Sequence, residues 1–195
     1  FEQDRNTFYQ DVDRSIKTLE DISGKKVRMF RAPGFSITET NKWAFEVLYE
    51  LGIEIDSSVF PAQRSHGGFA QYGAAEPSIL KYNGTQLKEF PINAHSVLTK
   101  PIIFSGGGYF RLFPYNVIKS FTEKSSYVMS YFHPRDFDPT QPMINDLSLQ
   151  RKFKSYVGLN TSQKKLITWL HDFQFTDISD ANDSIDWHKV KEIEL

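Results

Sequence analysis

Apolar residues recur at every third or fourth position near the start of the chain and predict two amphipathic helices. The first is expected within 7–22, where the apolar face contains Phe8, Val12, Ile16 and Leu19. Gly24 follows it as a helix C-cap. The second is expected between a cap at Thr38 and Gly52, with an apolar face of Trp43, Val47, Leu48 and Leu51.

Short apolar segments alternate with these helices and are predicted as strands. Residues 25–30 follow the first helix, and residues 53–56 follow the second. The order helix, strand, helix, strand with short connections is typical of a parallel α/β arrangement. Because the carboxyl ends of such strands face the ligand, the residues at these strand ends are candidates for a site.

The pattern continues with a hairpin and then with further helices. Segments 79–82 and 86–90 flank Asn83-Gly84, which favours a type I′ turn. The remaining elements are a long loop over 59–78, a flexible loop over 105–109, a strand over 127–132, and helices over 114–123, 149–156 and 161–173. The acidic, polar segment 177–195 is expected to be a peripheral tail.

Composition excludes several classes of function. The chain has 195 residues, with 23 basic and 24 acidic side chains, so no nucleic-acid partner that binds through net positive charge is expected. It has no cysteine, which excludes disulfides and metal sites with Cys ligands. No apolar segment approaches the roughly 20 residues of a membrane helix, so no transmembrane segment is predicted.

Three residues at predicted strand ends form a candidate acid–base set. They are Arg31, Asp56 and His133. A histidine can donate a proton to a leaving group, and an arginine next to a carboxylate keeps that carboxylate ionised. The alternative is structural: Arg31 and Asp56 form an ion pair, and His133 only ends a strand.

Four segments, in order along the chain, resemble motifs of the polysaccharide deacetylases, the family with the NodB homology domain that is also called carbohydrate esterase family four. They are Arg31 to Ser36 (Arg-Ala-Pro-Gly-Phe-Ser), Asp56 to Pro61 (Asp-Ser-Ser-Val-Phe-Pro), Ser105 to Arg111 (Ser-Gly-Gly-Gly-Tyr-Phe-Arg), and Tyr131 to Pro134 (Tyr-Phe-His-Pro) followed by Asp138-Pro139. The resemblance extends over about 8–175 and is closest to a bacterial branch linked to exopolysaccharides and surface glycans.

The resemblance implies a fold and a domain organisation. The expected fold is α/β, a distorted (β/α) barrel of the NodB type whose first strands are absent from this chain. Residues 1–176 would form this N-terminally incomplete domain, and 177–195 the tail. The location implied is the cytoplasm or the cell envelope of a bacterium.

The resemblance also implies an activity: hydrolysis of N-acetyl groups on the sugars of a cell-surface polysaccharide or its precursor. His133 would be the general acid, Arg31 would orient the base, and Asp56 would belong to the catalytic set. Residues expected to bind substrate are Pro33, Gly34, Phe35, His66, Gly107, Gly108 and Tyr109. The cofactor would be a divalent metal, commonly zinc, held by an aspartate and two histidines whose motifs do not occur here and are expected upstream of Phe1.

Several alternatives stay open at this level. The carboxylate that tunes His133 is Asp56, Asp136 or Asp138. The glycines at 106–108 form a substrate loop or a structural turn, since no Gly-x-Gly-x-x-Gly fingerprint surrounds them. His66 contacts substrate or lies in a plain surface loop. The alternative functions are hydrolysis of a non-sugar C–N bond, such as that of a cyclic ureide, and glycan binding without catalysis.

Overall fold

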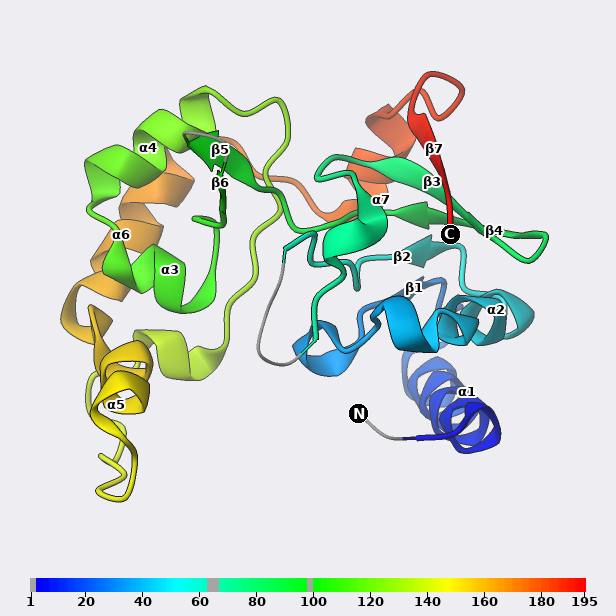
Figure 1. Cartoon of the computed structure of the whole chain (residues 1–195), viewed down its shortest axis with the longest axis horizontal. Coiled ribbons are helices and arrows are strands. Elements are labelled where there is room, and N and C mark those ends of the chain that lie inside the picture. Colours follow the sequence, from blue (N-terminus) through cyan, green and yellow to red (C-terminus); the bar gives the residue numbers. More distant parts are fainter. Residues whose placement is uncertain (1–2, 63–66, 98–99) are drawn as a thin grey trace. The chain divides into compact units, whose positions relative to one another are not determined.

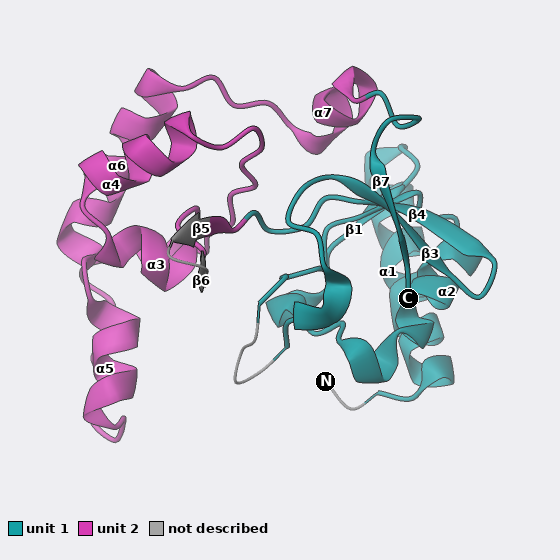
Figure 2. Cartoon of the chain, turned by 45° about the horizontal axis from the view of Figure 1, so that its top comes forward, with its two compact units in different colours: residues 1–93, 186–195 teal, residues 94–185 magenta. Residues whose placement is uncertain are grey.

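The chain divides into two compact units. A computed structural model describes residues 3–62, 67–97 and 100–195 (Figure 1). The first unit contains Phe1–Asn93 and Asp186–Leu195, and the second contains Ala94–Ile185 (Figure 2). No helix in the described part of the chain is long and apolar enough to cross a membrane.

A five-stranded sheet forms the centre of the first unit. Its order is β1-β2-β4-β3-β7, with bounds Met29–Phe30, Ile55–Asp56, Thr85–Glu89, Ser78–Tyr82 and Lys191–Glu194. β1, β2 and β4 are parallel neighbours, while β3 is antiparallel to β4 and parallel to β7. The predicted α/β class is therefore confirmed. The strands predicted over 25–30 and 53–56 exist as a parallel pair, although each is only two residues long.

The β3–β4 hairpin confirms the predicted turn. Asn83 and Gly84 have φ angles of 46° and 78°. A type I′ turn requires positive φ at both central residues, and asparagine and glycine tolerate this region best.

Both helices of the first unit form where the periodicity predicts them. α1 (Arg5–Ser23) begins at Asp4, whose side chain accepts a hydrogen bond from the Thr7 amide, and ends at Gly24 with φ 66°. α2 spans Trp43–Glu50. The predicted cap Thr38 instead begins a short 3₁₀ helix, η2 (Glu39–Asn41), in which the Thr38 amide donates to Asn41 Oδ1 over 2.6 Å.

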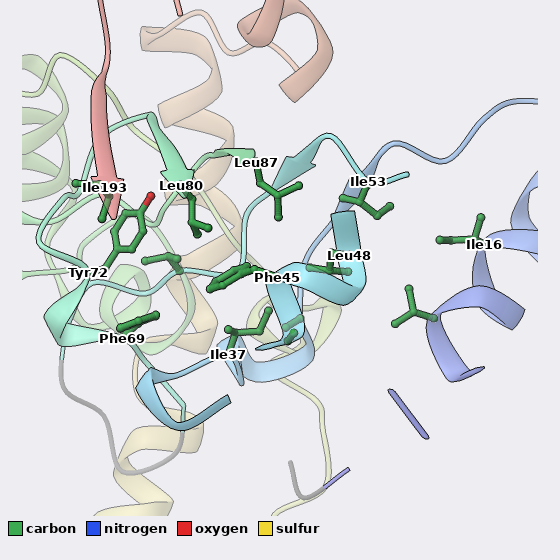
Figure 3. Packing of buried hydrophobic residues seen from close by; sticks show 14 residues of the cluster. Ile16, Ile37, Phe45, Leu48, Ile53, Phe69, Tyr72, Leu80, Leu87 and Ile193 are labelled. Carbon is green, nitrogen blue, oxygen red and sulfur yellow. The ribbon is translucent and has the colours of Figure 1, made fainter. Parts of the chain in front are cut away.

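The core of this unit lies between the helices and the sheet. Side chains from α2, the hairpin, η3 (Ala70–Tyr72) and β7 point into one apolar cluster, including Phe45, Leu48, Phe69, Tyr72, Leu80, Leu87 and Ile193 (Figure 3). Ile193 belongs to the segment predicted as a peripheral tail. The structure corrects that prediction, because β7 pairs with β3 and Ile193 is buried. This pairing joins residues far apart in the sequence, which local periodicity does not show.

The second unit is mainly helical. Its elements are β5 (His95–Val97), β6 (Lys100–Ile102), α3 (Gly107–Leu112), α4 (Tyr115–Glu123), η4 (Pro134–Phe137), α5 (Leu149–Tyr156), α6 (Leu159–Asp172) and α7 (Ile178–Ser184). The three helices predicted here match α4, α5 and α6. Its core contains Phe104, Phe110, Ile118 and Trp169.

Two predictions in the second unit are wrong. The segment 127–132 forms no strand; its ladder contact is an isolated bridge between Gly106 and Tyr131. The apolar Phe132 packs its ring against Phe110, with centroids 4.9 Å apart, and lies near Trp169. Its burial therefore comes from side-chain packing and not from pairing with a neighbouring strand. The predicted loop 105–109 overlaps α3, which begins at Gly107.

Candidate functional site

Arg31 lies directly after β1 and reaches the residue that follows β2. Its Nε donates to the Ser57 carbonyl over 3.1 Å, and its guanidinium also donates to Ser57 Oγ over 2.7 Å. Because β1 and β2 are parallel neighbours, their carboxyl ends meet at one edge of the sheet. The structure therefore brings the first two resembling segments together, as the sequence predicts.

The turn after Arg31 is held against these residues. Ala32 donates its amide to Ser58 Oγ over 2.8 Å, and η1 (Pro33–Phe35) follows with positive φ at Gly34 and Phe35. Pro33 and Gly34 are exposed. The Phe35 ring is buried against Phe60, with centroids 5.4 Å apart, so its side chain supports the turn from within.

Gly67 supports the same turn from outside. A Cβ atom at this position would collide with the carbonyl oxygen of Phe35, and Gly67 has φ +66°. The next residue, Gly68, donates its amide to that same carbonyl over 2.9 Å. The backbone at Gly67 and Gly68 therefore packs directly on the exposed turn at Pro33-Gly34. His66, predicted to bind substrate, lies outside the described residues.

Asp56 is completely buried and organises the loop after β2. Its Oδ2 accepts the Ser58 amide at 2.9 Å, and its Oδ1 accepts Ser58 Oγ at 2.7 Å. The same hydroxyl accepts the Ala32 amide, so Asp56 fixes the contact between the two segments. The structure gives Asp56 these partners at a site closed to solvent, which suits a positioning residue.

A second carboxyl, Glu89, faces Asp56 and was missed by the sequence analysis. The two residues are register partners on the parallel strands β4 and β2, and Glu89 is completely buried. Glu89 Oε1 accepts the Val59 amide at 3.1 Å, and no donor of the described residues reaches Oε2. A signal for it existed: Glu89 lies two positions after the buried Leu87 and therefore on the same face of the strand.

The electrostatics of this pair favour one shared proton. Burial, and then the adjacent Asp56 carboxylate, raise the pKa of Glu89 well above its ordinary value. Burial also raises the pKa of Asp56, although the hydrogen bonds that it accepts oppose this change. Asp56 has the donors that stabilise a carboxylate, and Glu89 has an oxygen without a donor. We therefore assign the proton to Glu89.

His133, in the second unit, begins the 3₁₀ helix η4, and its side chain is exposed. Its backbone amide donates to Asp136 Oδ2 over 2.9 Å, and the Asp136 amide donates back to the His133 carbonyl over 2.8 Å. Asp138 instead accepts two hydrogen bonds from Thr140, which lower its pKa. Of the carboxylates considered, Asp136 is thus the one bonded to the His133 backbone.

The glycines before α3 permit close packing on Tyr131, two residues before His133. A Cβ atom at Gly106 would overlap the Tyr131 carbonyl, and the buried Gly107 donates its amide to that carbonyl over 3.1 Å. Gly108 is half-buried, whereas Tyr109 is 47% exposed. Of the substrate residues predicted in this segment, Tyr109 is therefore the one whose side chain a ligand can reach.

A metal centre is not formed by the described residues. No three His, Cys, Asp or Glu side chains within 3–62, 67–97 and 100–195 lie close enough together to hold an ion. The exposed His133 and the buried Asp56–Glu89 pair do not supply the set of three open ligands that a catalytic zinc requires.

A solved structure has a similar fold. The structure is similar to a crystal structure described as a "putative polysaccharide deacetylase" from Mycobacterium smegmatis, with a TM-score of 0.55 and 15% sequence identity. The match covers 98% of this chain and 60% of that one, so this chain spans less than two thirds of the length of the solved protein. The mixed α/β fold thus resembles that of this solved protein.

The family follows from the sequence comparison. The profile of a family described as a domain of unknown function (DUF3473) matches residues 57–183, more than half of the chain. The chain therefore belongs to this family. No curated protein matches it.

Proposed function

We propose that this protein is a deacetylase-like hydrolase that removes N-acetyl groups from the sugars of a polysaccharide or of its precursor. The observation that carries the proposal is His133: its side chain is exposed, its backbone is fixed by Asp136, and it lies in the last of the four segments that resemble motifs of the deacetylases. The deacetylase-like fold and the order of the four motifs support the same reaction class.

Each residue has a proposed role in the hydrolysis. Water adds to the acetyl carbon and gives a proton to a carboxylate base that is proposed to lie outside the described residues; the C–N bond breaks, acetate leaves, and the sugar nitrogen takes up a proton. The His133 imidazolium donates that proton to the departing nitrogen, since an amine anion is a poor leaving group. Arg31 orients the base, while Asp56 and Glu89 hold the loop on which Arg31 rests.

Each unit has exposed groups that are proposed to bind substrate. Pro33 and Gly34 form one wall of a sugar groove in the first unit, and Tyr109 offers a ring for stacking on a sugar face in the second. The proposal also includes the barrel that the resemblance implies and a divalent metal, commonly zinc, whose ligands lie outside the described residues.

The test is acetate release by the protein with its full natural chain. N-acetylated oligosaccharides and cyclic ureides are offered side by side, before and after dialysis against a chelator. We expect release of acetate from the oligosaccharides, loss on chelation and recovery with zinc. Opening of the ureide without release of acetate would contradict the proposal.

Substitution of the proposed acid sharpens this test. His133→Ala should lower kcat by roughly 10²–10⁴, the usual contribution of a general acid. His171→Ala is the matched control, because this histidine is 88% exposed on α6 and has no proposed role. An unchanged rate for His133→Ala on a substrate that the wild type hydrolyses would remove His133 from the mechanism.

A further inference from the structure

A buried ion pair lies next to His133. Arg111 Nε is 3.1 Å from Asp136 Oδ1, and both side chains are only 6% exposed. Arg111 is the second-to-last residue of α3, and Asp136 belongs to η4. A buried ion pair is costly to desolvate, and removal of one partner leaves an uncompensated buried charge.

Asp136 uses its two oxygens for two different partners. Oδ1 faces Arg111, and Oδ2 accepts the backbone amide of His133 at 2.9 Å. The carboxylate therefore connects the Arg111 guanidinium to the residue that carries the exposed imidazole. An asparagine at this position has only one acceptor oxygen and could not satisfy both partners.

Arg111 is itself held rigidly. Its guanidinium donates to the carbonyls of Ser155 and Lys154 at the end of α5, over 2.7 Å and 2.9 Å. Its own carbonyl accepts Lys165 Nζ of α6 at 2.6 Å. Ser162, one turn before Lys165, donates to the Asp136 carbonyl over 2.6 Å. The ion pair is thus anchored to three helices, and its position is transmitted to the His133 turn.

We propose that Arg111 is a positioning residue of the hydrolase: through Asp136 it fixes the backbone of His133 and hence the point from which the imidazole projects. This inference rests on the proposed role of His133 as proton donor. A small displacement of such a donor lowers the rate of proton transfer more than it lowers substrate affinity, because the donor is needed only as the bond breaks.

The experiment compares Asp136→Asn and Arg111→Met with the wild-type protein. Arg151→Met is the matched control, since this arginine is exposed on α5. Two substrates are used: an N-acetylated oligosaccharide, whose nitrogen must be protonated, and 4-nitrophenyl acetate, whose leaving group departs as a stable anion. Hydrogen exchange of the His133 backbone amide is measured by NMR in the same proteins.

We expect both variants to lower kcat on the oligosaccharide about 10- to 100-fold with KM little changed, and to leave hydrolysis of the ester nearly intact. In both variants, hydrogen exchange of the His133 amide should accelerate relative to amides of the Trp169 core. Asp136→Asn preserves the contacts of Arg111 with α5, so faster exchange in this variant would not come from a loss of those contacts. Equal losses on both substrates, or an unchanged His133 amide, would overturn the inference. Absence of wild-type activity on both substrates would instead contradict the proposed function. The exchange comparison would still show whether Arg111 and Asp136 hold the His133 backbone.

Discussion

Replacing Glu89 with glutamine should remove a pH dependence from the stability of the first unit. Glutamine is nearly isosteric with a protonated glutamic acid, so it can accept the Val59 amide and present an N–H to Asp56. It cannot ionise. The variant therefore preserves the contacts of the folded state and deletes only the titration.

The direction of this pH dependence follows from where the proton is bound. Burial and the Asp56 carboxylate raise the pKa of Glu89 in the folded protein, whereas the unfolded chain has the ordinary value of 4.5. Between these two pKa values the folded state holds a proton that the unfolded state has lost. The free energy of unfolding should therefore fall as pH rises above 4.5, by at most about 1.4 kcal/mol per pH unit for one proton. Below pH 4.5 Glu89 is protonated in both the folded and the unfolded state, and its contribution to the stability is fully present.

The assay is urea unfolding followed at a series of pH values from 4 to 9 for the wild type, Glu89→Gln and the control Glu54→Gln. Glu54 is an exposed residue beside β2 whose ion pair with Arg28 spans 3.4 Å, and such surface pairs contribute little. We expect the difference in stability between Glu89→Gln and the wild type to grow with pH above 4.5, and the Glu54→Gln curve to parallel the wild type. Parallel curves for all three proteins would refute the assignment of the proton to Glu89.

Two further predictions concern the turn after β1. Arg31→Ala should lower kcat about 10- to 100-fold with little change in sugar affinity, because the guanidinium orients the site through Ser57; Arg28→Ala, exposed before β1, is the control. Equal losses of rate and affinity would indicate direct binding of substrate by Arg31. Gly67→Ala should destabilise the protein more than Gly24→Ala. Both glycines have φ +66°, so both substitutions cost roughly 1–2 kcal/mol in backbone strain. Only the Cβ added at Gly67 would also collide with the Phe35 carbonyl, because the space around Gly24 is open. Calorimetry on both variants measures the difference, and equal costs would show that Gly67 does not pack tightly on the turn.

Much of the local structure could be predicted from the sequence. The helices α1, α2, α4, α5 and α6 follow from apolar spacing and from caps at their ends, and the hairpin follows from Asn83-Gly84. These features depend on residues within one or two turns of each other. The placement of Arg31 and Asp56 at one sheet edge could also be predicted, since parallel neighbouring strands end on the same side.

Other features depend on partners that are distant in the sequence. The apolar residues over 127–132 suggested a strand, but Phe132 packs among the aromatic rings of the second unit without a ladder. The acidic segment after 177 suggested a tail, but β7 completes the sheet and Ile193 enters the core. In both cases the local composition is compatible with more than one structure, and long-range packing selects between them.

The chemistry of the candidate site divides in the same way. The sequence by itself determined the candidates for the groups that carry it, Arg31, Asp56 and His133, because these side chains stand in recognisable motifs at the ends of local elements. Only the tertiary structure decided their environment: Asp56 is buried against Glu89, and His133 is fixed through Asp136 to Arg111. Burial and ion pairing arise when segments separated along the chain come into contact, and these contacts determine where a proton is bound and how rigidly its donor is held.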